Sequence, residues 1–389
     1  MLLTKDASPI VFEFTNDTFQ AIAEIDDFKS LQWSESYRGH SSFEMWAPVN
    51  ERNKECFKKG NIIWLGGDTA AVIEIVNPQT ENENVKVYDI KGRTIECFLH
   101  RRIIWGTFYA AENDDIAYSM QRMVDFNFVN LTPEQIASGL GYRAFNWMEV
   151  DDTFRCGITN SFQRTGVEVY DALVDIAQNY GLGFKIKFAP EQQKLLFQVY
   201  KGVDRTINNT AGNEPVVFDT DMEDVLGSNY YTSDQDYKNV GFVAGEGSGY
   251  SRSWVVVGDE ELEGVDRREI YVDARDVQSE QQDAEGNIKV LTEEEYTQSL
   301  TQRGEETLAE HVVVESFESK IRVVGDVNYQ YGVDYFIGDM ITVIDRDLGL
   351  QVNAQVMSAE EVWADTYSLN LTFGFTRPTI LQKVRRMIR

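Results

Sequence analysis

Residues that could do chemistry are sparse and scattered in this chain. His40, His100 and His311 each lack a second histidine or a nucleophile at the spacing that metal or catalytic sites use. Asp345 and Asp347 could form a cation-binding pair, but aspartates in turns more often serve the backbone geometry. The chain has 64 acidic side chains, so a chance pair at glycosidase separation stays open. We therefore predict a protein that is not an enzyme, with no catalytic, cofactor-binding or metal-binding residues.

Cysteines and glycines add no further chemistry. Cys56, Cys97 and Cys156 are an odd number at wide spacing, which argues against a disulfide framework or a zinc site. The glycine-rich segment 245–249 precedes an apolar strand pattern rather than a helix. A phosphate-binding loop needs a helix N-terminus behind it, so nucleotide binding is not expected here.

The chain is strongly acidic, with 36 basic against 64 acidic side chains and a net charge of −28. Binding to nucleic acid needs clustered Lys and Arg, so tight binding is not expected. An acidic wall would still let DNA slide past, although solubility alone also explains the charge. The basic cluster at Lys383, Arg385, Arg386 and Arg389 is either a solvated tail or a docking strip for an acidic neighbour.

Length and composition favour several ordered domains. The chain has 389 residues, of which 42% are hydrophobic and 12% aromatic, so two to four domains are expected. Apolar runs are all shorter than the roughly 20 residues that a membrane span needs. The first residues lack a basic segment followed by an apolar core, so neither a transmembrane segment nor a secretory signal is expected.

One short pattern occurs near both ends of the chain. Residues 57–63 contain Phe, then Gly60-Asn61 and an apolar strand, and residues 336–341 repeat this with Gly338-Asp339. Each continues into a later strand that closes on a glycine, Gly92 or Gly374. Gly-Asn and Gly-Asp steps supply turns with positive φ. The repeat predicts two similar small β barrels, and two unrelated strand-turn-strand units are the alternative.

The pattern of elements predicts an α+β chain that is mainly β. Apolar spacing over 166–179 predicts a helix ending at Gly181, and Thr292 before three glutamates predicts a second helix start. We expect two small antiparallel β barrels with an α+β domain and a helical insertion between their parts. The predicted boundaries are 1–100 for the N-terminal barrel, 101–214 for the α+β domain, 215–262 and 312–378 for the discontinuous second barrel, 263–311 for the insertion and 379–389 for the basic tail.

Several short motifs in this order resemble those of a known family. They are Lys201-Gly202-Val203-Asp204-Arg205-Thr206, Tyr271-Val272-Asp273-Ala274-Arg275-Asp276, Glu295-Tyr296 with Leu300, Arg303-Gly304, Leu308-Ala309-Glu310, Asp334-Tyr335-Phe336-Ile337-Gly338-Asp339, and Thr372-Phe373-Gly374 with Pro378-Thr379-Ile380. Together they are similar to the tail-tip or baseplate hub family of siphoviruses of Gram-positive hosts, including the N-terminal hub part of tail-associated lysins.

The resemblance implies a structural protein of the virion at the distal end of a phage tail. A homotrimer would present six similar barrels to the tail tube and line the DNA exit channel. Expected partners are the distal tail protein or tail tube, the tape measure protein, and tip or receptor-binding proteins, with assembly in the host cytoplasm. Some relatives continue into a peptidase or a fibre. The chain stops after the hub pattern, so wall-degrading activity is not expected.

Two alternatives stay open at this point. Within the same class, the chain could be the hub of a contractile injection particle or of a phage-derived bacteriocin. From a different class, it could be a cell-wall or polysaccharide hydrolase or binding module with exposed aromatic side chains.

Overall fold

The computed structural model describes residues 7–14, 18–82, 85–222, 225–282, 288–321, 328–346 and 349–374. The basic tail, residues 379–389, lies outside the described residues, and so does Asp347 of the candidate aspartate pair. The described chain is mainly β with a smaller helical share, so the predicted fold class is confirmed.

The N-terminal module is a set of antiparallel strands whose alternate residues are apolar. Leu31, Trp33, Phe43 and Met45 all point to one buried side, as the period of a half-buried strand requires. Its elements are β1 (Ile10–Phe14), β2 (Phe19–Glu24), β3 (Ser30–Ser36), β4 (Ser42–Pro48), α1 (Glu51–Cys56), β5 (Ile62–Trp64), β6 (Ala70–Asn82) and β7 (Val85–Thr94).

The C-terminal module has the same strand order. Its neighbours run β14-β20-β23-β22-β21-β13, which matches β3-β4-β7-β6-β5-β1 of the first module. One pair differs, because β1 and β5 are antiparallel whereas β13 and β21 are parallel. The strands are β13 (Val217–Asp219), β14 (Val225–Ser233), β20 (Val314–Ile321), β21 (Met340–Asp345), β22 (Leu350–Trp363) and β23 (Tyr367–Gly374).

An α+β domain covers the outer face of β1, β5 and β6 in the first module. Phe98, Leu173 and Phe188 share a buried core with Ile62 and Val72 of that module. Within this domain β11 and β12 form an antiparallel hairpin. Its elements are η1 (Ile95–Arg101), β8 (Thr107–Ala110), α2 (Ile116–Val124), α3 (Pro133–Ala137), β9 (Met148–Asp151), β10 (Phe162–Thr165), α4 (Val169–Tyr180), β11 (Gly183–Ala189) and β12 (Lys194–Tyr200).

Both predicted helix signals are confirmed. Helix α4 ends at Gly181, whose φ of +69° is the left-handed cap conformation that glycine adopts readily. Helix α5 (Glu293–Glu310) begins with a capping box between Thr292 and Glu295.

The insertion is larger than predicted. Strands β15 (Val240–Ala244) and β16 (Trp254–Gly258), expected in the second barrel within 215–262, form instead a separate sheet with β17 (Glu269–Asp273), in the order β16-β15-β17. The reason is burial, because Val243, Val257 and Val272 share a core with Leu300 of α5. The remaining insertion strands are β18 (Glu280–Gln282) and β19 (Ile288–Val290).

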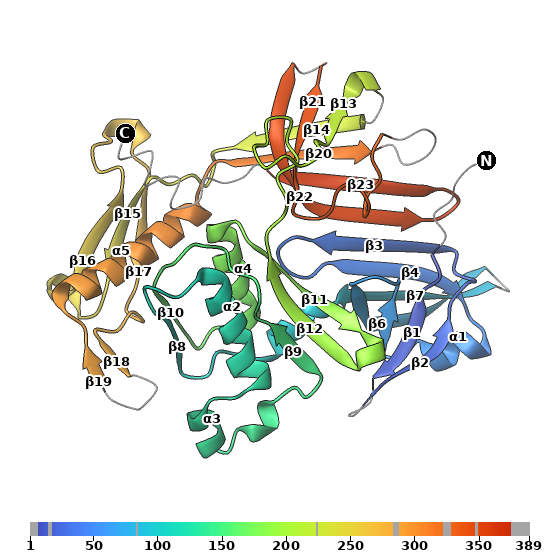
Figure 1. Ribbon diagram of the computed structural model, residues 1–389, viewed down its shortest axis with the longest axis horizontal. Helices are drawn as coiled ribbons and strands as arrows, with labels where there is room; N and C mark the ends of the chain where they lie inside the picture. The colour runs from blue at the N-terminus through green and yellow to red at the C-terminus, as the bar shows by residue number, and fades with distance from the viewer. Residues whose placement is uncertain are drawn as a thin grey trace.

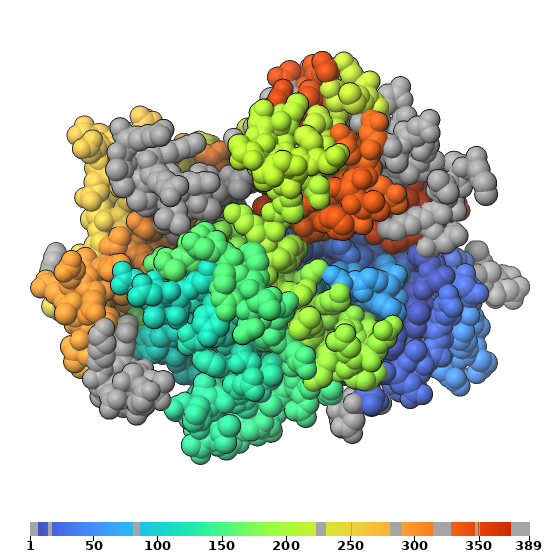
Figure 2. Space-filling model, in the orientation of Figure 1, coloured from blue at the N-terminus to red at the C-terminus, as the bar shows by residue number. Residues whose placement is uncertain are grey.

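Figure 1 shows how these parts are arranged. β3 and β4 of the first module lie beside β22 and β23 of the second, and the insertion lies on the far side of the α+β domain. A buried ion pair joins the insertion to that domain, with Arg164 Nη2 3.0 Å from Glu306 Oε2. The space-filling view shows the α+β domain in the middle of the molecule, in contact with both modules and with the insertion (Figure 2).

Candidate functional site

The two Gly-Asn and Gly-Asp steps form the same turn. Gly60 has a φ of +93° and Gly338 a φ of +94°, in the region that favours glycine. The N–H of Gly60 donates to the carbonyl of Ile73 at 2.8 Å, and the N–H of Ile73 donates to the carbonyl of Asn61 at 2.8 Å. The second turn makes the corresponding bonds, from Gly338 N–H to Val356 O at 2.8 Å and from Val356 N–H to Asp339 O at 2.9 Å.

The likeness continues into the paired strands. β6 and β22 each carry a bulge directly after the residue that bonds to the turn, which is Ile73 in one and Val356 in the other. The pairing sets Gly92 opposite Ile73 and Phe373 opposite Val356. The expected match of Gly92 with Gly374 is therefore wrong by one residue, because similar side chains are not a measure of register.

The two modules join through one strand pair. The half of β22 beyond its bulge, Ser358–Trp363, runs antiparallel to β3, so the sheets of both modules become one sheet of thirteen strands. The N–H of Tyr37 donates to the carbonyl of Met357 at 2.9 Å beside this pair. Each β22 residue beyond the bulge therefore has a neighbour on both sides.

The equivalent half of β6, residues 75–80, has a neighbour on one side. Among the described residues it pairs with β7 alone, and β14 pairs with β20 alone. Burial differs in the same way: Ala359 and Trp363 of β22 are buried, whereas Val76 and Thr80 at the equivalent positions of β6 are half-buried and exposed. These are two unpaired sheet edges in an otherwise repeated arrangement.

One face of the shared sheet is polar across both modules. Glu360 Oε2 accepts from Asn370 Nδ2 at 2.8 Å, and Glu360 Oε1 accepts from Gln32 Nε2 of the other module. Further along, Lys91 Nζ lies 3.0 Å from Glu44 Oε1. Side chains of this face therefore bridge β23, β22, β3, β4 and β7, on the side opposite the apolar core.

Electrostatics favour the charged forms of Glu44 and Lys91 on this face. The indole Nε1 of Trp46 donates to Glu44 Oε1 at 2.8 Å, and this bond lowers the pKa of Glu44, helped by Lys91. The same carboxylate raises the pKa of Lys91. Such half-exposed pairs contribute little stability, so the face is better suited to solvent and to a polar ligand than to a buried contact.

Two motifs of the sequence meet where the second module is anchored. Asp339 Oδ1 accepts from the N–H of Val203 at 2.8 Å, and Asp339 Oδ2 lies 3.0 Å from Arg205 Nε. A Cβ on Gly202 would lie 1.8 Å from the carbonyl oxygen of Gly338, so this approach needs glycine. Both segments are among the sequence motifs, but the sequence did not indicate that they contact each other.

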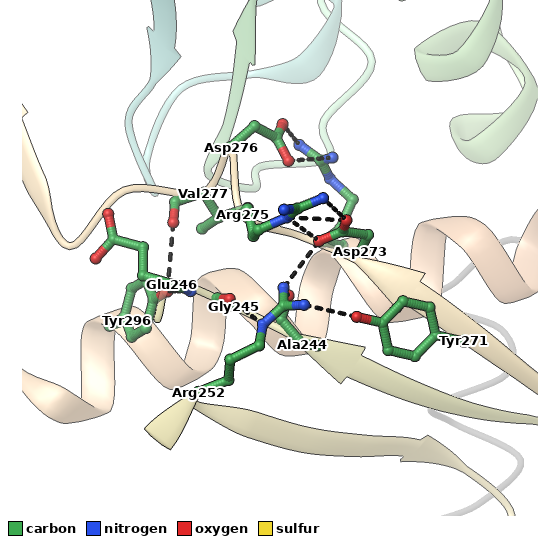
Figure 3. A network of polar contacts seen from close by, with 11 residues as sticks. Ala244, Gly245, Glu246, Arg252, Tyr271, Asp273, Arg275, Asp276, Val277 and Tyr296 are labelled. Atoms are coloured by element: carbon green, nitrogen blue, oxygen red, sulfur yellow. Dashed lines mark hydrogen bonds and ion pairs between the residues drawn. The ribbon is translucent and has the colours of Figure 1, made fainter. Parts of the chain in front are cut away.

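A third motif, residues 271–276, closes the insertion (Figure 3). Arg252 Nε donates to the carbonyl of Gly245 at 2.8 Å, and its two Nη atoms contact Tyr271 Oη at 2.6 Å and Asp273 Oδ1 at 2.8 Å. Arg275 also contacts Asp273. The two arginines hold the pKa of Asp273 far below its usual range. We assign these residues a structural role, since their donors and acceptors face one another.

Two of the three histidines lie together. The ring of His100 stacks on Tyr170 at a centroid distance of 3.9 Å, and the ring of His40 stacks on the same tyrosine at 5.0 Å. His100 Nδ1 lies 2.6 Å from Glu168 Oε2. His100, Glu168 and Asp171 have ligand atoms within 4.8 Å of one another, so they could hold a metal ion. No sequence spacing indicated this cluster, because tertiary packing brings it together.

The cysteines are unsuited to nucleophilic chemistry. All three are free thiols, and Cys56 and Cys97 are buried. Burial raises the pKa of Cys97 to about 12, so its reactive thiolate is scarce at neutral pH. Across the described residues, none of the helices combines the length and apolar character needed to cross a membrane.

Comparisons with known proteins come from a family model and from solved structures. The model for siphovirus ReqiPepy6 Gp37-like proteins matches residues 11–375. The fold is similar to the tail protein from Neisseria meningitidis MC58, at 12% identity and a TM-score of 0.57, covering 94% of this chain and 96% of that one.

Two prophage tail proteins have the same overall fold. The 43 kDa tail protein of prophage MuSo2 from Shewanella oneidensis is 12% identical with a TM-score of 0.55, covering 95% of this chain and 98% of its own. Tail protein gp18 from Listeria monocytogenes EGD-e is 11% identical with a TM-score of 0.50, covering 98% of both chains. A search of curated proteins gives no match.

Proposed function

The chain belongs to the family of siphovirus ReqiPepy6 Gp37-like proteins, and from this premise we propose that it is a hub at the distal end of a phage tail. Three copies would form a ring that joins the tail tube to the tip and surrounds the channel through which DNA leaves. This ring would be built in the host cytoplasm and carried in the virion.

The repeated module is the observation that carries this proposal. Each chain holds two sheets of the same strand order, with equivalent turns and bulges. Three such chains present six similar modules, so a trimer can sit on a six-fold tube with little mismatch. The two modules in each chain thus give a physical reason for a trimer to bind a six-fold tube.

The free edges supply the contact between copies. Within the chain, β22 beyond its bulge pairs with β3 of the other module. The equivalent partners are β6 beyond its bulge and β14, and both have unpaired edges among the described residues. If β6 of one copy pairs with β14 of the next as β22 pairs with β3, the modules alternate around a closed ring. Closure removes the exposed edges that otherwise invite aggregation.

The register of this contact follows from the register inside the chain. Ser358, Glu360 and Val362 lie opposite Ser36, Ser34 and Gln32. Matching the bulges and the hairpin pairs puts Ile75 opposite Ser233, Asn77 opposite Tyr231 and Gln79 opposite Asn229 of the next copy.

Pro78 of β6 is compatible with an edge strand that makes one hydrogen bond fewer to its neighbour. Its counterpart in β22 is Glu361, which lies opposite Trp33. Proline has no N–H, so the contact at this position would lose one hydrogen bond and keep the one that the proline carbonyl accepts. Proline also protects the edge of a free monomer from wrong partners.

The polar face of the shared sheet would line the channel. It carries Glu44, Asp89 and Lys91 of the first module and Glu360 of the second, in a chain of net charge −28. A surface of bridged charges and amides offers little to bind a duplex, so DNA would pass without tight contact. The outer surfaces would be left for the distal tail protein or tail tube, the tape measure protein and the tip or receptor-binding proteins.

The experiment is the mass of the purified particle across a salt series. Each chain of 44.5 kDa carries −28, so copies around one axis repel each other. Salt shortens the Debye length to about 8 Å at 0.15 M, and the trimer should become more stable as salt rises. A monomer at every salt concentration in sedimentation runs, or tight binding of added duplex DNA at low salt, would contradict the proposal.

A further inference from the structure

A cavity in the α+β domain gathers positive charge in this acidic chain. Its volume is about 320 Å³, and it lies between the end of η1 and the segment after α3. Its lining residues are His100, Arg101, Arg102, Ile103, Tyr142 and Arg143. Three arginines in one small cavity repel each other unless an anion lies among them.

The arginines bond to neutral groups. Arg102 Nε donates to the carbonyl of Arg143 at 3.0 Å, and Arg102 Nη1 donates to the carbonyl of Arg101 at 2.8 Å. Arg143 Nη2 donates to the carbonyl of Ile103 at 2.7 Å. The guanidinium of Arg101 lies 4.0 Å from the ring centroid of Phe98. Among the described residues, no carboxylate forms an ion pair with any of the three.

One of these charges is buried. Arg143 is 9% exposed, and its Nη1 is shut away from solvent with no hydrogen-bond partner. A buried charge without an opposite charge beside it destabilises the folded state. Glu168, the carboxylate beside this lining, lies against His100 Nδ1 at 2.6 Å. The site as it stands has positive charge to offer to a ligand.

The pKa directions agree with this geometry. Burial lowers the pKa of Arg143, and burial together with the charges of Arg143 and Arg101 lowers the pKa of Arg102. Burial also lowers the pKa of Arg101. Arginine stays protonated in proteins. Burial of these charges therefore destabilises the folded state until an anion binds beside them.

The rim of the cavity is apolar. Tyr142 is 79% exposed and Ile103 is 50% exposed. Exposed aromatic and aliphatic side chains around a cationic centre are typical of protein interfaces, in which arginine and tyrosine are enriched. The phosphate backbone of DNA would make no apolar contacts with this rim, and the acidic chain around the cavity repels it.

We propose that this cavity is a docking site for an acidic segment of a partner protein, with a carboxylate held by Arg101 and Arg102 in front of Arg143 and apolar residues packed on Tyr142 and Ile103. Guanidinium groups bind carboxylates through paired, charge-assisted hydrogen bonds. The site lies outside the shared sheet, so it would remain available when copies join through their sheet edges.

The test uses the full chain and a synthetic peptide rich in glutamate and tyrosine, with its binding followed by fluorescence anisotropy at low salt. The comparison peptide has glutamine in place of every glutamate. Arg101→Gln and Arg102→Gln each remove one positive charge of the cavity. Lys59→Gln removes one positive charge from an exposed position elsewhere and serves as the matched control. Thermal melting of each variant checks that it is folded.

We expect the acidic peptide to bind, the glutamine peptide not to bind, and each arginine variant to lose affinity by about tenfold or more. Lys59→Gln should bind like the natural chain, and inorganic phosphate should compete only weakly because it lacks apolar contacts. Equal losses in Lys59→Gln, or no binding of the acidic peptide, would overturn the proposal. Duplex DNA that binds more tightly than the peptide, and depends on the same arginines, would also overturn it.

Discussion

The turns at Gly60 and Gly338 have the same backbone and different surroundings. Their φ angles differ by one degree and their hydrogen bonds correspond. A Cβ on Gly60 would meet nothing within 4 Å, whereas a Cβ on Gly338 would lie 2.4 Å from the ring of Tyr37. Local geometry fixed the first turn, and local geometry together with a packing contact fixed the second.

The residues after each glycine differ in the same way. The side chain of Asn61 donates to the carbonyl of Cys56 at 2.8 Å, within its own module. The side chain of Asp339 reaches Arg205 and Val203, which lead from the α+β domain. The first module therefore uses the turn to cap a helix, and the second uses it as an anchor. The same turn therefore has a different structural role in each module.

Tyr37 makes the anchor. It is fully buried, its Oη donates to the carbonyl of Gly181 at 3.1 Å, and its ring lies where side chains on Gly183 or Gly338 would clash. Two segments from distant parts of the chain, residues 181–183 and Gly338, thus meet on the side chain of Tyr37. The close approach to the ring depends on glycine at 183 and 338.

Gly338→Ala should destabilise the chain more than any other change considered below. Both the positive φ and the clash with Tyr37 oppose the new methyl group, so we expect a loss of about 3 kcal/mol or more in the free energy of unfolding. Gly60→Ala is the matched control, because it adds the same strain without a clash and should cost about 1 kcal/mol. Urea unfolding of both variants measures the difference. Equal losses would contradict the anchor.

The second expected effect is that of Asp339→Asn. This change keeps the shape of a side chain that is 4% exposed and removes the charge facing Arg205. We expect a loss of about 2 kcal/mol, less than for a fully buried pair because Arg205 is 20% exposed. A double-mutant cycle with Arg205→Met isolates the pair. A coupling energy near zero would show that the anchor does not depend on this contact.

A third prediction concerns the α+β domain where it packs on the first module. Glu96 is buried and its Oε1 accepts from the N–H of Ile186 at 2.8 Å. Burial raises the pKa of Glu96 above its ordinary value. The folded state therefore binds a proton more tightly than the unfolded chain, and stability should fall as the pH rises through the folded pKa.

Glu96→Gln should remove this pH dependence. The amide oxygen can still accept from Ile186, so we expect a gain of about 1 kcal/mol at neutral pH and no gain at acidic pH, where Glu96 is protonated. Glu191→Gln, on an exposed side chain, is the control and should follow the natural chain. Urea unfolding at several pH values is the measurement. A parallel pH dependence in Glu96→Gln and the natural chain would contradict the assignment.

Ile75→Ser, which copies Ser358 at the equivalent position of β22, should change stability least. Ile75 is 51% exposed in the single chain, so the free energy of unfolding should change by less than about 0.5 kcal/mol. The trimer should persist, since serine already lies at the joint inside the chain. Loss of the trimer in this variant would show that β6 and β22 are not equivalent.

Sequence predicted the features that depend on local geometry. The Gly-Asn and Gly-Asp steps predicted a repeat because a positive-φ turn is set by the residues within it. The caps at Thr292 and Gly181 predicted helix ends for the same reason. The order of the elements and the family resemblance were also available from the sequence, and the family match is confirmed.

Features that depend on distant partners could not be predicted. The sequence did not show that β15 and β16 prefer β17 and α5 to the second module, because pairing partners are chosen by packing. Arg101 and Arg102 are adjacent in the sequence, but only the fold brings Arg143 to them. The stack of His40 and His100 on Tyr170 has the same origin.

In the proposed ring, β6 of one copy pairs with β14 of the next in the register of β22 and β3. The bond from Tyr37 N–H to Met357 O makes Glu360 and Ser34 a non-hydrogen-bonded pair, whose Cα atoms lie about 4.5 Å apart. The equivalent pair between copies is Asn77 and Tyr231, a separation that a disulfide can span. Asn77→Cys with Tyr231→Cys should therefore give a covalent trimer on a non-reducing gel, and Asn77→Cys with Ser228→Cys, out of register, should not. A trimer by mass that forms no such bond would contradict the strand pairing, and a monomer throughout would contradict the ring.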